Sequence, residues 1–181
     1  MIFTPLALDG AYRVDLERRG DSRGYFARMF CREEFRDHGL TDTWSQCNMS
    51  HSAQKATLRG MHFQRAPKAE AKLVKCMAGA AFDVIVDLRR GSTTFGNWAT
   101  VTLTAEGGEM IYIPQGFAHG FQTLTDDTQL LYFHSDYYSP DHEGGLHHAD
   151  PKVGISWPLE VNSLSDRDRT LPFLSKVEPI S

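Results

Sequence analysis

Apolar and polar residues alternate along several short stretches of this chain. Residues 80–88 and 98–105 show the two-residue period of a β-strand, and residues 109–114 and 128–135 continue the strand-like pattern. Glycine, proline and aspartate residues separate these stretches, as in the sequences RRGST, PQG and TDDT, and such residues favour tight turns. Many short strands at regular spacing predict a β-sandwich or a β-barrel.

Two segments depart from this strand pattern. Residues 32–39, with the sequence REEFRDHG, carry acidic residues early and end on a histidine and a glycine, which predicts a short helix. Residues 158–173 are polar and contain two prolines. We expect the chain from residue 158 on to wrap the surface and to end in a loop or a short helical turn.

Size, charge and cysteine content narrow the class of protein. A length of 181 residues, with 41% apolar and 23% charged residues, fits one globular domain with terminal arms. A net charge of −4 lacks the basic character of a general nucleic-acid-binding protein. No signal-peptide pattern and no apolar run of membrane-spanning length is present. Three cysteines without a CxxC pair favour free thiols, as in a reducing cytosol. From these features together we expect a cytoplasmic protein with no nucleic-acid or membrane partner.

The sequence LRGMHFQ, residues 58–64, places His62 next to several apolar residues. On a regular strand, His62 and Arg59 point to opposite faces. If both residues serve one site, the strand must be kinked between them. Gly60 stands at the position where a bulge would produce that kink.

Three roles are open to His62. A metal site of the cupin kind needs a His-x-His pair, but Gln64 occupies the second position, and its amide is a poor ligand for transition metals. His147 and His148 are adjacent, so on a strand their rings would point apart. A lone histidine is most often a hydrogen-bonded core residue. The third role, a proton-transfer base, depends on the polar residues that accompany His62.

Four polar residues in strand-like sequences favour the proton-transfer role. Lys72 lies between apolar neighbours, where an ammonium group needs a partner. Asp83, His119 and Tyr132 lie in the sequences FDVIVDL, GFAHGF and LLYFHS. Each of them has a structural explanation by itself. Together with His62 they would line one barrel with a base, a cation, a carboxylate and a phenol, a set that suits proton transfer next to a carbonyl.

In its motifs the chain resembles the dTDP-4-dehydrorhamnose 3,5-epimerase family of cupin-like enzymes. The resemblance covers nearly the whole chain and rests on motifs in one order: DSRGYF, QCNMS, LRGMHFQ, AKLVKC, DVIVDLR, STTFGNW, IPQGFAHGF, YYSPDHEGG, DPKVGISWP and LSDRD. It implies an all-β fold, a cupin-like double-stranded β-helix or jelly roll with a few short helices. We expect a single domain over residues 1–181, with an N-terminal arm to about residue 45 and a C-terminal wrap from about residue 150.

The resemblance implies four catalytic residues. His62 matches the base, Asp168 the aspartate that pairs with it, Tyr132 the acid on the opposite face of the sugar, and Lys72 the cation that holds the developing enolate. A ketone at C4 of the sugar acidifies the C–H bonds at C3 and C5. Since the substrate thus carries its own electron sink, we expect neither a cofactor nor a metal ion.

The resemblance also implies a set of binding residues. Positions that match the nucleotide and diphosphate site are Arg23, Phe26, Gln46, Asn48, Arg59 and Tyr138, and positions that match polar pocket residues are Asp83 and His119. The family is dimeric, and Arg23 is expected to reach into the site of its partner. Two departures lie near nucleotide-contacting positions: Arg28 replaces a usual glutamate, and Arg167, which we also expect to bind substrate, replaces a usual lysine.

We therefore expect an isomerase of deoxysugar and dTDP-rhamnose biosynthesis that epimerises a nucleotide-linked 4-keto-6-deoxyhexose. The first candidate substrate is dTDP-4-dehydro-6-deoxy-D-glucose, inverted at C3 and C5. The alternatives are an epimerase of one centre, C3 or C5, on a dTDP-, CDP- or GDP-linked ketosugar, a nucleotide-sugar-binding cupin without turnover, and a metal-dependent cupin. Intact His62, Asp168 and Tyr132 oppose the binding-only hypothesis, and Gln64 opposes the metal hypothesis.

Overall fold

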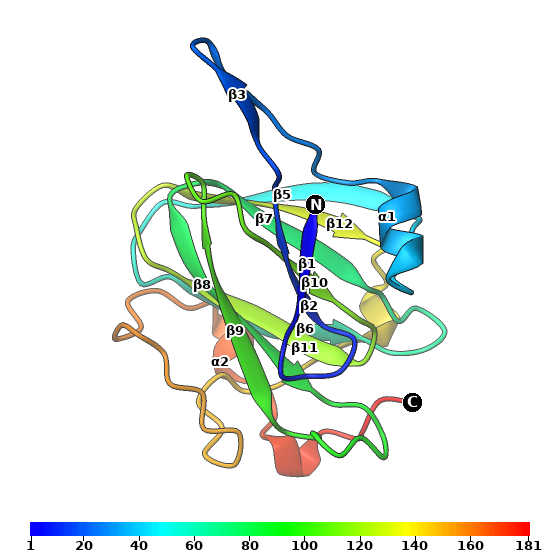
Figure 1. The fold of residues 1–181 in the computed structure, drawn as a ribbon. Coiled ribbons are helices and arrows are strands. Elements are labelled where there is room, and N and C mark those ends of the chain that lie inside the picture. Colours follow the sequence, from blue (N-terminus) through cyan, green and yellow to red (C-terminus); the bar gives the residue numbers. More distant parts are fainter.

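A computed structural model describes residues 1–181, and its main feature is a pair of antiparallel β-sheets packed face to face (Figure 1). The larger sheet has six strands in the order β1 (Ile2–Pro5), β2 (Tyr12–Asp15), β10 (Met110–Ile113), β7 (Lys72–Ala78), β12 (Thr128–His134) and β5 (Gln46–Ser52). The smaller sheet has five strands in the order β13 (Glu143–Gly145), β6 (Leu58–Gln64), β11 (Phe117–Thr123), β8 (Ala80–Asp87) and β9 (Trp98–Thr104). This architecture confirms the predicted all-β jelly roll.

The four stretches predicted as strands are β8, β9, β10 and β12, each within one residue of its predicted bounds at either end. Their period also sets the layers of the core. The cluster between the sheets includes Ile85 of β8, Val74 of β7 and Leu130 of β12. Val84 and Val86 of β8 instead face a second cluster on the outer side of the five-stranded sheet.

The predicted helix at residues 32–39 is confirmed as α1 (Arg32–Asp37). The backbone turns out of the helix at Gly39, where φ is +69°, a left-handed conformation that glycine adopts without steric cost. The helix covers the outer face of the six-stranded sheet through Phe35, which is fully buried. The Phe35 ring meets those of Phe3 and Tyr112 edge-on, at centroid distances of 5.2 and 6.1 Å.

The C-terminal segment runs over the outer face of the five-stranded sheet. It contains the helix α2 (Asp166–Arg169). One short 3₁₀ turn precedes this helix, at Pro140–His142, and another follows it, at Leu174–Lys176. Near the end, the Ile180 amide donates to the Leu88 carbonyl oxygen, and the Ile180 carbonyl oxygen accepts the Arg90 amide, each at 2.7 Å. Val153, Val177 and Ile180 pack on this face of the sheet. The 3₁₀ turn at Leu174–Lys176 agrees with the loop or short helical turn expected near the end of the chain.

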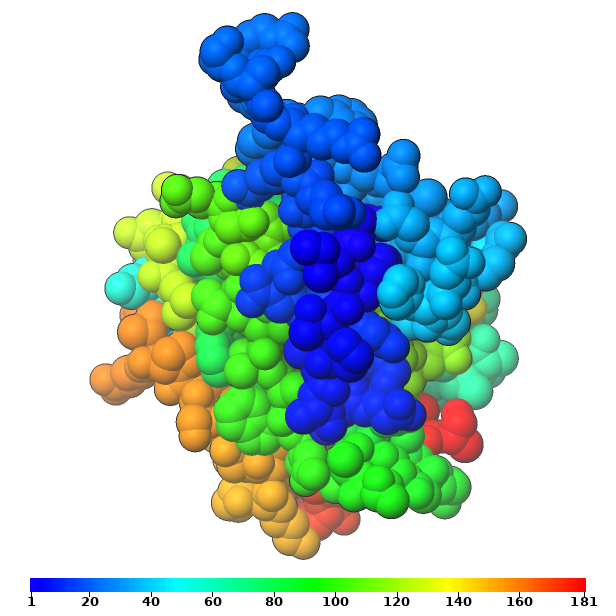
Figure 2. Space-filling model, in the orientation of Figure 1, coloured from blue at the N-terminus to red at the C-terminus, as the bar shows by residue number.

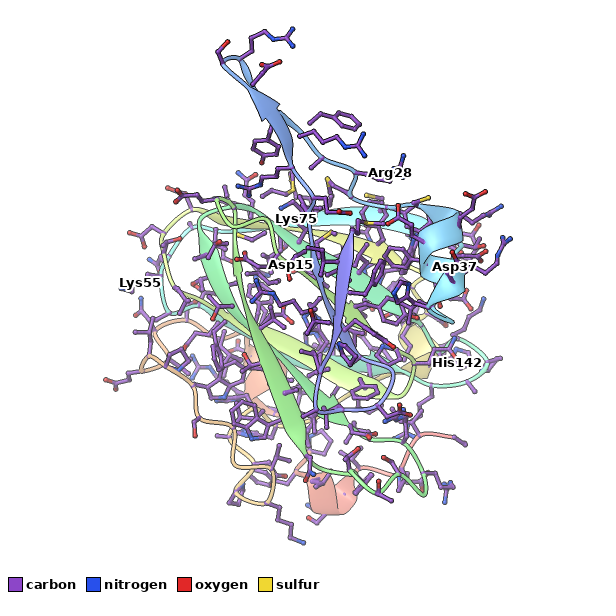
Figure 3. The ribbon with its side chains drawn as sticks, viewed as in Figure 1. Asp15, Arg28, Asp37, Lys55, Lys75 and His142 are labelled. Carbon is purple, nitrogen blue, oxygen red and sulfur yellow. The ribbon has the colours of Figure 1, made fainter.

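A hairpin of β3 (Arg19–Asp21) and β4 (Gly24–Phe26) projects from the body of the molecule (Figures 1 and 2). Phe26 is 72% exposed, and Tyr25 is also exposed. Figure 3 shows Arg28 between this hairpin and α1, and its guanidinium lies 3.0 Å from the Glu34 carboxylate of the helix. The hairpin thus presents aromatic side chains that its own chain leaves uncovered.

The three cysteines, Cys31, Cys47 and Cys76, are free thiols, as predicted from their number and spacing. Every helix in the fold is too short and too polar to cross a membrane.

Candidate active site

A cavity of about 600 Å³ opens between the two sheets at one end of the sandwich. The five-stranded sheet contributes side chains from β6 and β11, and the six-stranded sheet contributes side chains from β5, β7 and β12. The loop and helix at residues 163–168 close one side. Groups on opposite walls of this cavity can therefore reach a single bound molecule from two directions.

On the wall formed by β6, His62 and Asp168 form a hydrogen-bonded pair. His62 Nε2 lies 2.7 Å from Asp168 Oδ1. The other carboxylate oxygen, Oδ2, accepts the Gly60 amide at 3.1 Å, and the Ser165 hydroxyl caps the helix by accepting the Asp168 amide at 3.1 Å. Burial disfavours ionisation of Asp168, but the hydrogen bonds from His62 and Gly60 outweigh it and hold the pKa of this carboxyl below its usual value. The carboxylate fixes the Nε2–H tautomer of His62 and leaves the lone pair on Nδ1.

The kink predicted at Gly60 is confirmed by the pairing of β6 with β11. Arg59 pairs with Phe121 and His62 pairs with His119, so two residues of β6 stand opposite Gly120 alone. Gly60 has φ of +126°, and a Cβ atom there would lie 2.5 Å from Gly120 Cα. The bulge brings Arg59 and His62 to the same cavity, although regular strand geometry would separate them.

Tyr132 faces the cavity from β12, in the opposite sheet. Its hydroxyl lies 2.9 Å from the Ser50 hydroxyl of β5. Burial raises the pKa of the Tyr132 phenol above its ordinary value, and the hydrogen bond with Ser50 only partly opposes this effect. Tyr132 is therefore a neutral proton donor at physiological pH.

Lys72 lies on the same wall, at the start of β7. Its ammonium group is 3.2 Å from Glu70 Oε1, and Glu70 Oε2 is 2.8 Å from His134 Nδ1. The partner that the buried ammonium of Lys72 requires is thus Glu70. Neither Glu70 nor His134 was predicted from the sequence. Their spacing was a usable signal, because Glu70 and His134 lie two residues from Lys72 and Tyr132 and so share their faces.

His119 lines the cavity on β11, but Asp83 does not, which corrects one expectation from the sequence. Asp83 lies on β8, is completely buried, and its two oxygens are 3.0 and 2.9 Å from His119 Nε2. The sheet order places β8 behind β11 as seen from His62. Asp83 therefore orients the ring of His119 and has no surface with which to contact a ligand.

The mouth of the cavity carries several of the predicted binding residues. Tyr138 donates its hydroxyl to Glu143 Oε2 at 2.9 Å, and Arg167 lies 2.7 Å from Glu143 Oε1. Glu143, absent from the sequence predictions, thereby joins two predicted residues. Asn48 and Arg59 line the same cavity. Gln46 is not part of the wall, but its side-chain oxygen accepts the Tyr138 amide at 2.8 Å and so positions that residue.

Two predicted binding residues, Arg23 and Phe26, do not lie in the cavity of their own chain. Both belong to the projecting hairpin. The Arg23 guanidinium pairs with Asp21 at 2.5 Å and its side chain is 87% exposed. Within one chain these two residues can contribute nothing to the site described above.

The residues considered for a metal site serve other purposes. Gln64 donates to the carbonyl oxygens of Lys68 and Tyr137, at 2.9 and 3.2 Å, and accepts the Ser139 amide at 2.6 Å, so it ties two loops together. His147 and His148 follow β13, outside any strand, and their rings stack with centroids 4.6 Å apart. The expectation that these two rings point apart was therefore wrong. No three His, Cys, Asp or Glu side chains are arranged to hold a metal ion.

Comparison with known proteins gives a consistent match over the whole chain. The family model described as dTDP-4-dehydrorhamnose 3,5-epimerase matches residues 5–176. A protein of that name from Sinorhizobium fredii is 42% identical over 182 residues, which span 100% of this chain and 93% of that protein. One from Salmonella typhimurium is 43% identical, over 97% of each chain. A dTDP-4-dehydro-6-deoxyglucose 3-epimerase from a Streptomyces species is 38% identical, over 96% of this chain and 89% of that one.

Solved structures match equally well. The dTDP-4-dehydrorhamnose 3,5-epimerase of Bacillus anthracis, with TDP and PPi bound, superposes with a TM-score of 0.92 at 40% identity and covers 96% of this chain and 99% of its own. An epimerase of Legionella pneumophila, in complex with dTDP-4-keto-L-rhamnose, gives a TM-score of 0.91 at 37% identity, over 98% of this chain and 94% of its own.

Proposed function

Because the chain belongs to the dTDP-4-dehydrorhamnose 3,5-epimerase family, we propose that it epimerises dTDP-4-dehydro-6-deoxy-D-glucose at C3 and C5. The protein is a sugar epimerase, an isomerase that acts on a nucleotide-linked 4-keto-6-deoxyhexose. One observation supports the assignment of roles within the site: His62, paired with Asp168 of α2, lies on one sheet, and the phenol of Tyr132 lies on the other.

His62 is the base of this reaction. The C4 ketone acidifies the adjacent C–H bonds, and a neutral imidazole on one face of the sugar removes a proton from C3 or C5. The nearby carboxylate of Asp168 stabilises the imidazolium that forms and holds the ring in one orientation. Asp168 does not itself need to accept the proton.

Tyr132 is the acid. Inversion requires that the enolate receive its new proton on the face opposite to the base, since return of the proton by His62 restores the original centre. Tyr132 lies on the opposite sheet, and its raised pKa keeps the phenol protonated until it donates.

Lys72 supplies the cation at the oxyanion end of the cavity. Negative charge develops on the C4 oxygen as the C–H bond breaks, and fixed donors in a partly dry site stabilise it most. The ammonium of Lys72 reaches the cavity, and the ring of His119, oriented by Asp83, forms part of the polar wall.

Arg59 and Arg167 hold the diphosphate at the mouth. A chain with a net charge of −4 needs local cations to bind a dianion, and guanidinium groups bind phosphate through two parallel hydrogen bonds. Asn48 and Tyr138 line the same region. The protein forms a homodimer in which Arg23 and Phe26, on the projecting hairpin, complete the site of the partner.

A second candidate is epimerisation at C3 alone, which the resemblance to a 3-epimerase of 38% identity supports. Proton NMR in D₂O with dTDP-4-dehydro-6-deoxy-D-glucose separates the possibilities. Deuterium at C3 and C5 with inversion at both carbons is the expected result. Inversion at C3 only identifies the single-centre enzyme, and a protein that binds dTDP but exchanges no deuterium refutes the epimerase assignment. CDP- and GDP-linked ketosugars test the nucleotide preference in the same assay.

A further inference from the structure

Beside Lys72, the cavity wall carries a buried carboxylate that the mechanism above does not use. The side chain of Glu70 is only 8% exposed. Both of its oxygens are engaged, Oε1 by the Lys72 ammonium at 3.2 Å and Oε2 by His134 Nδ1 at 2.8 Å. A buried acid this close to the oxyanion site affects the charge that the site presents.

The strand register produces this cluster. Lys72 and His134 are direct partners on the antiparallel strands β7 and β12, so their side chains are neighbours on one face. Glu70 precedes Lys72 by two residues and points to the same side. Tyr132 lies two residues before His134 on the same face of β12, and the two rings are nearly parallel, with centroids 6.0 Å apart. All four side chains line the cavity.

The electrostatic consequence follows from the charges. Burial opposes ionisation of Glu70, but His134 and Lys72 outweigh it and hold its pKa below the ordinary value, so Glu70 is an anion. An anion 3.2 Å from the Lys72 ammonium weakens the positive field that Lys72 exerts on a developing enolate.

We propose that Glu70 and His134 are positioning residues for the epimerisation. Glu70 fixes the Lys72 ammonium for contact with the C4 oxygen, and the ring of His134, which engages the second oxygen of Glu70, keeps the charge of this carboxylate from cancelling that of Lys72. The proposal rests on the epimerase function given above. The other titratable groups that face the cluster across the cavity or flank it at the wall are His119 with Asp83 behind it, Tyr132, His62 with Asp168, and the pair of Lys68 and Asp136.

The test is a double-mutant cycle on the full-length protein, with kcat and KM for dTDP-4-dehydro-6-deoxy-D-glucose measured from pH 5 to 9. His134→Asn removes the imidazole that engages Glu70 Oε2, so kcat should fall about ten-fold while KM changes little. Glu70→Gln/His134→Asn should recover most of that loss, since no uncompensated carboxylate remains beside Lys72. Glu70→Gln alone should change the pH profile of kcat, because no carboxylate charge then lies beside Lys72.

A matched control is available in His51, whose ring lies 3.0 Å from Asp127 and is 49% exposed at the surface. His51→Asn should leave kcat and its pH profile unchanged. Additive losses in the double variant, or wild-type kcat in His134→Asn at every pH, would overturn the proposal. If His134→Asn does not fold, the pH profile of Glu70→Gln decides the question, and a profile like the wild type overturns the proposal. An inactive wild-type protein refutes the epimerase function instead, so the two failures are distinguishable.

Discussion

His62 Nε2 and Asp168 Oδ1 lie 2.7 Å apart, although 106 positions separate the two residues in the chain. The C-terminal segment brings Asp168 back across β6, where it also accepts the Gly60 amide. The position of the proposed base therefore depends on the docking of a short helix that lies far from it in sequence.

The first prediction tests this pair. His62→Ala should lower kcat on the order of 10²–10⁴-fold, the usual range for a positioned base. Asp168→Asn should also lower kcat, because the imidazolium loses its charge partner and the ring loses its fixed tautomer. Asp166→Asn is the control, since Asp166 lies on the same helix but is exposed. Deuterium wash-in measures proton abstraction directly. A silent Asp168→Asn beside an impaired Asp166→Asn would show that the wrong carboxylate was assigned.

The second prediction concerns the dependence of stability on pH. Asp87 is buried, yet hydrogen bonds from Arg89, Ser92 and Thr94 outweigh the effect of burial and lower its pKa from 3.8 to about 2. A pKa lowered on folding stabilises the native state above the unfolded value and loses that effect as pH falls through the folded value. Asp87→Asn should therefore reduce the free energy of unfolding by about 2 kcal/mol at pH 7. Urea unfolding should show this difference shrinking between pH 4 and pH 2, and a difference independent of pH would contradict the assignment.

The sequence predicted these strands because short apolar or alternating stretches are separated by turn-forming residues, a pattern that is visible without the structure. It predicted the bulge at Gly60 because a chemical demand, Arg59 and His62 in one site, conflicted with regular strand geometry. Asp168 could be placed only by resemblance, since nothing local links it to His62.

The residues that sequence reasoning missed depend on the register between strands. Glu70 and His134 meet because β7 and β12 pair Lys72 with His134, and Glu143 meets Arg167 through the C-terminal segment. The misplacement of Asp83 has the same origin, because alternation gives the face of a strand but not its order in the sheet.

The third prediction tests Gly60. Gly60→Ala adds a Cβ 2.5 Å from the Gly120 backbone and imposes a φ of +126° on an L-residue. We expect a loss of at least about 2 kcal/mol in the free energy of unfolding, together with a fall in kcat, because the strain shifts His62. Gly91→Ala is the control, since Gly91 has φ of +75° with no atom within 4 Å of an added Cβ. It should cost about 1 kcal/mol and leave kcat unchanged. Equal effects in the two variants would show that close packing at Gly60 is unimportant.

The fourth prediction tests the proposed exchange of Arg23 between subunits. Arg23→Ala should raise KM, because the diphosphate loses a cation. Mixing His62→Ala with Arg23→Ala subunits then gives a sharp outcome. If Arg23 acts across the interface, a mixed dimer has one site with both residues intact, and activity returns on mixing. If Arg23 acts within its own chain, no site in the mixed dimer is complete and activity stays low. Arg59→Ala mixed with His62→Ala should show no recovery, since both residues line one cavity in the same chain.

The fifth prediction concerns Tyr132, on the wall opposite His62. A base on one face can remove and return the same proton, which exchanges deuterium without inverting the carbon. Tyr132→Phe keeps the ring and deletes only the hydroxyl that lies 2.9 Å from Ser50. We expect the variant to wash deuterium from D₂O into the substrate while net epimerisation falls on the order of 10²-fold or more at one or both carbons. Ser50→Ala keeps the phenol and should retain much more of the activity. Inversion of both centres at the wild-type rate by Tyr132→Phe would place the acid on another residue.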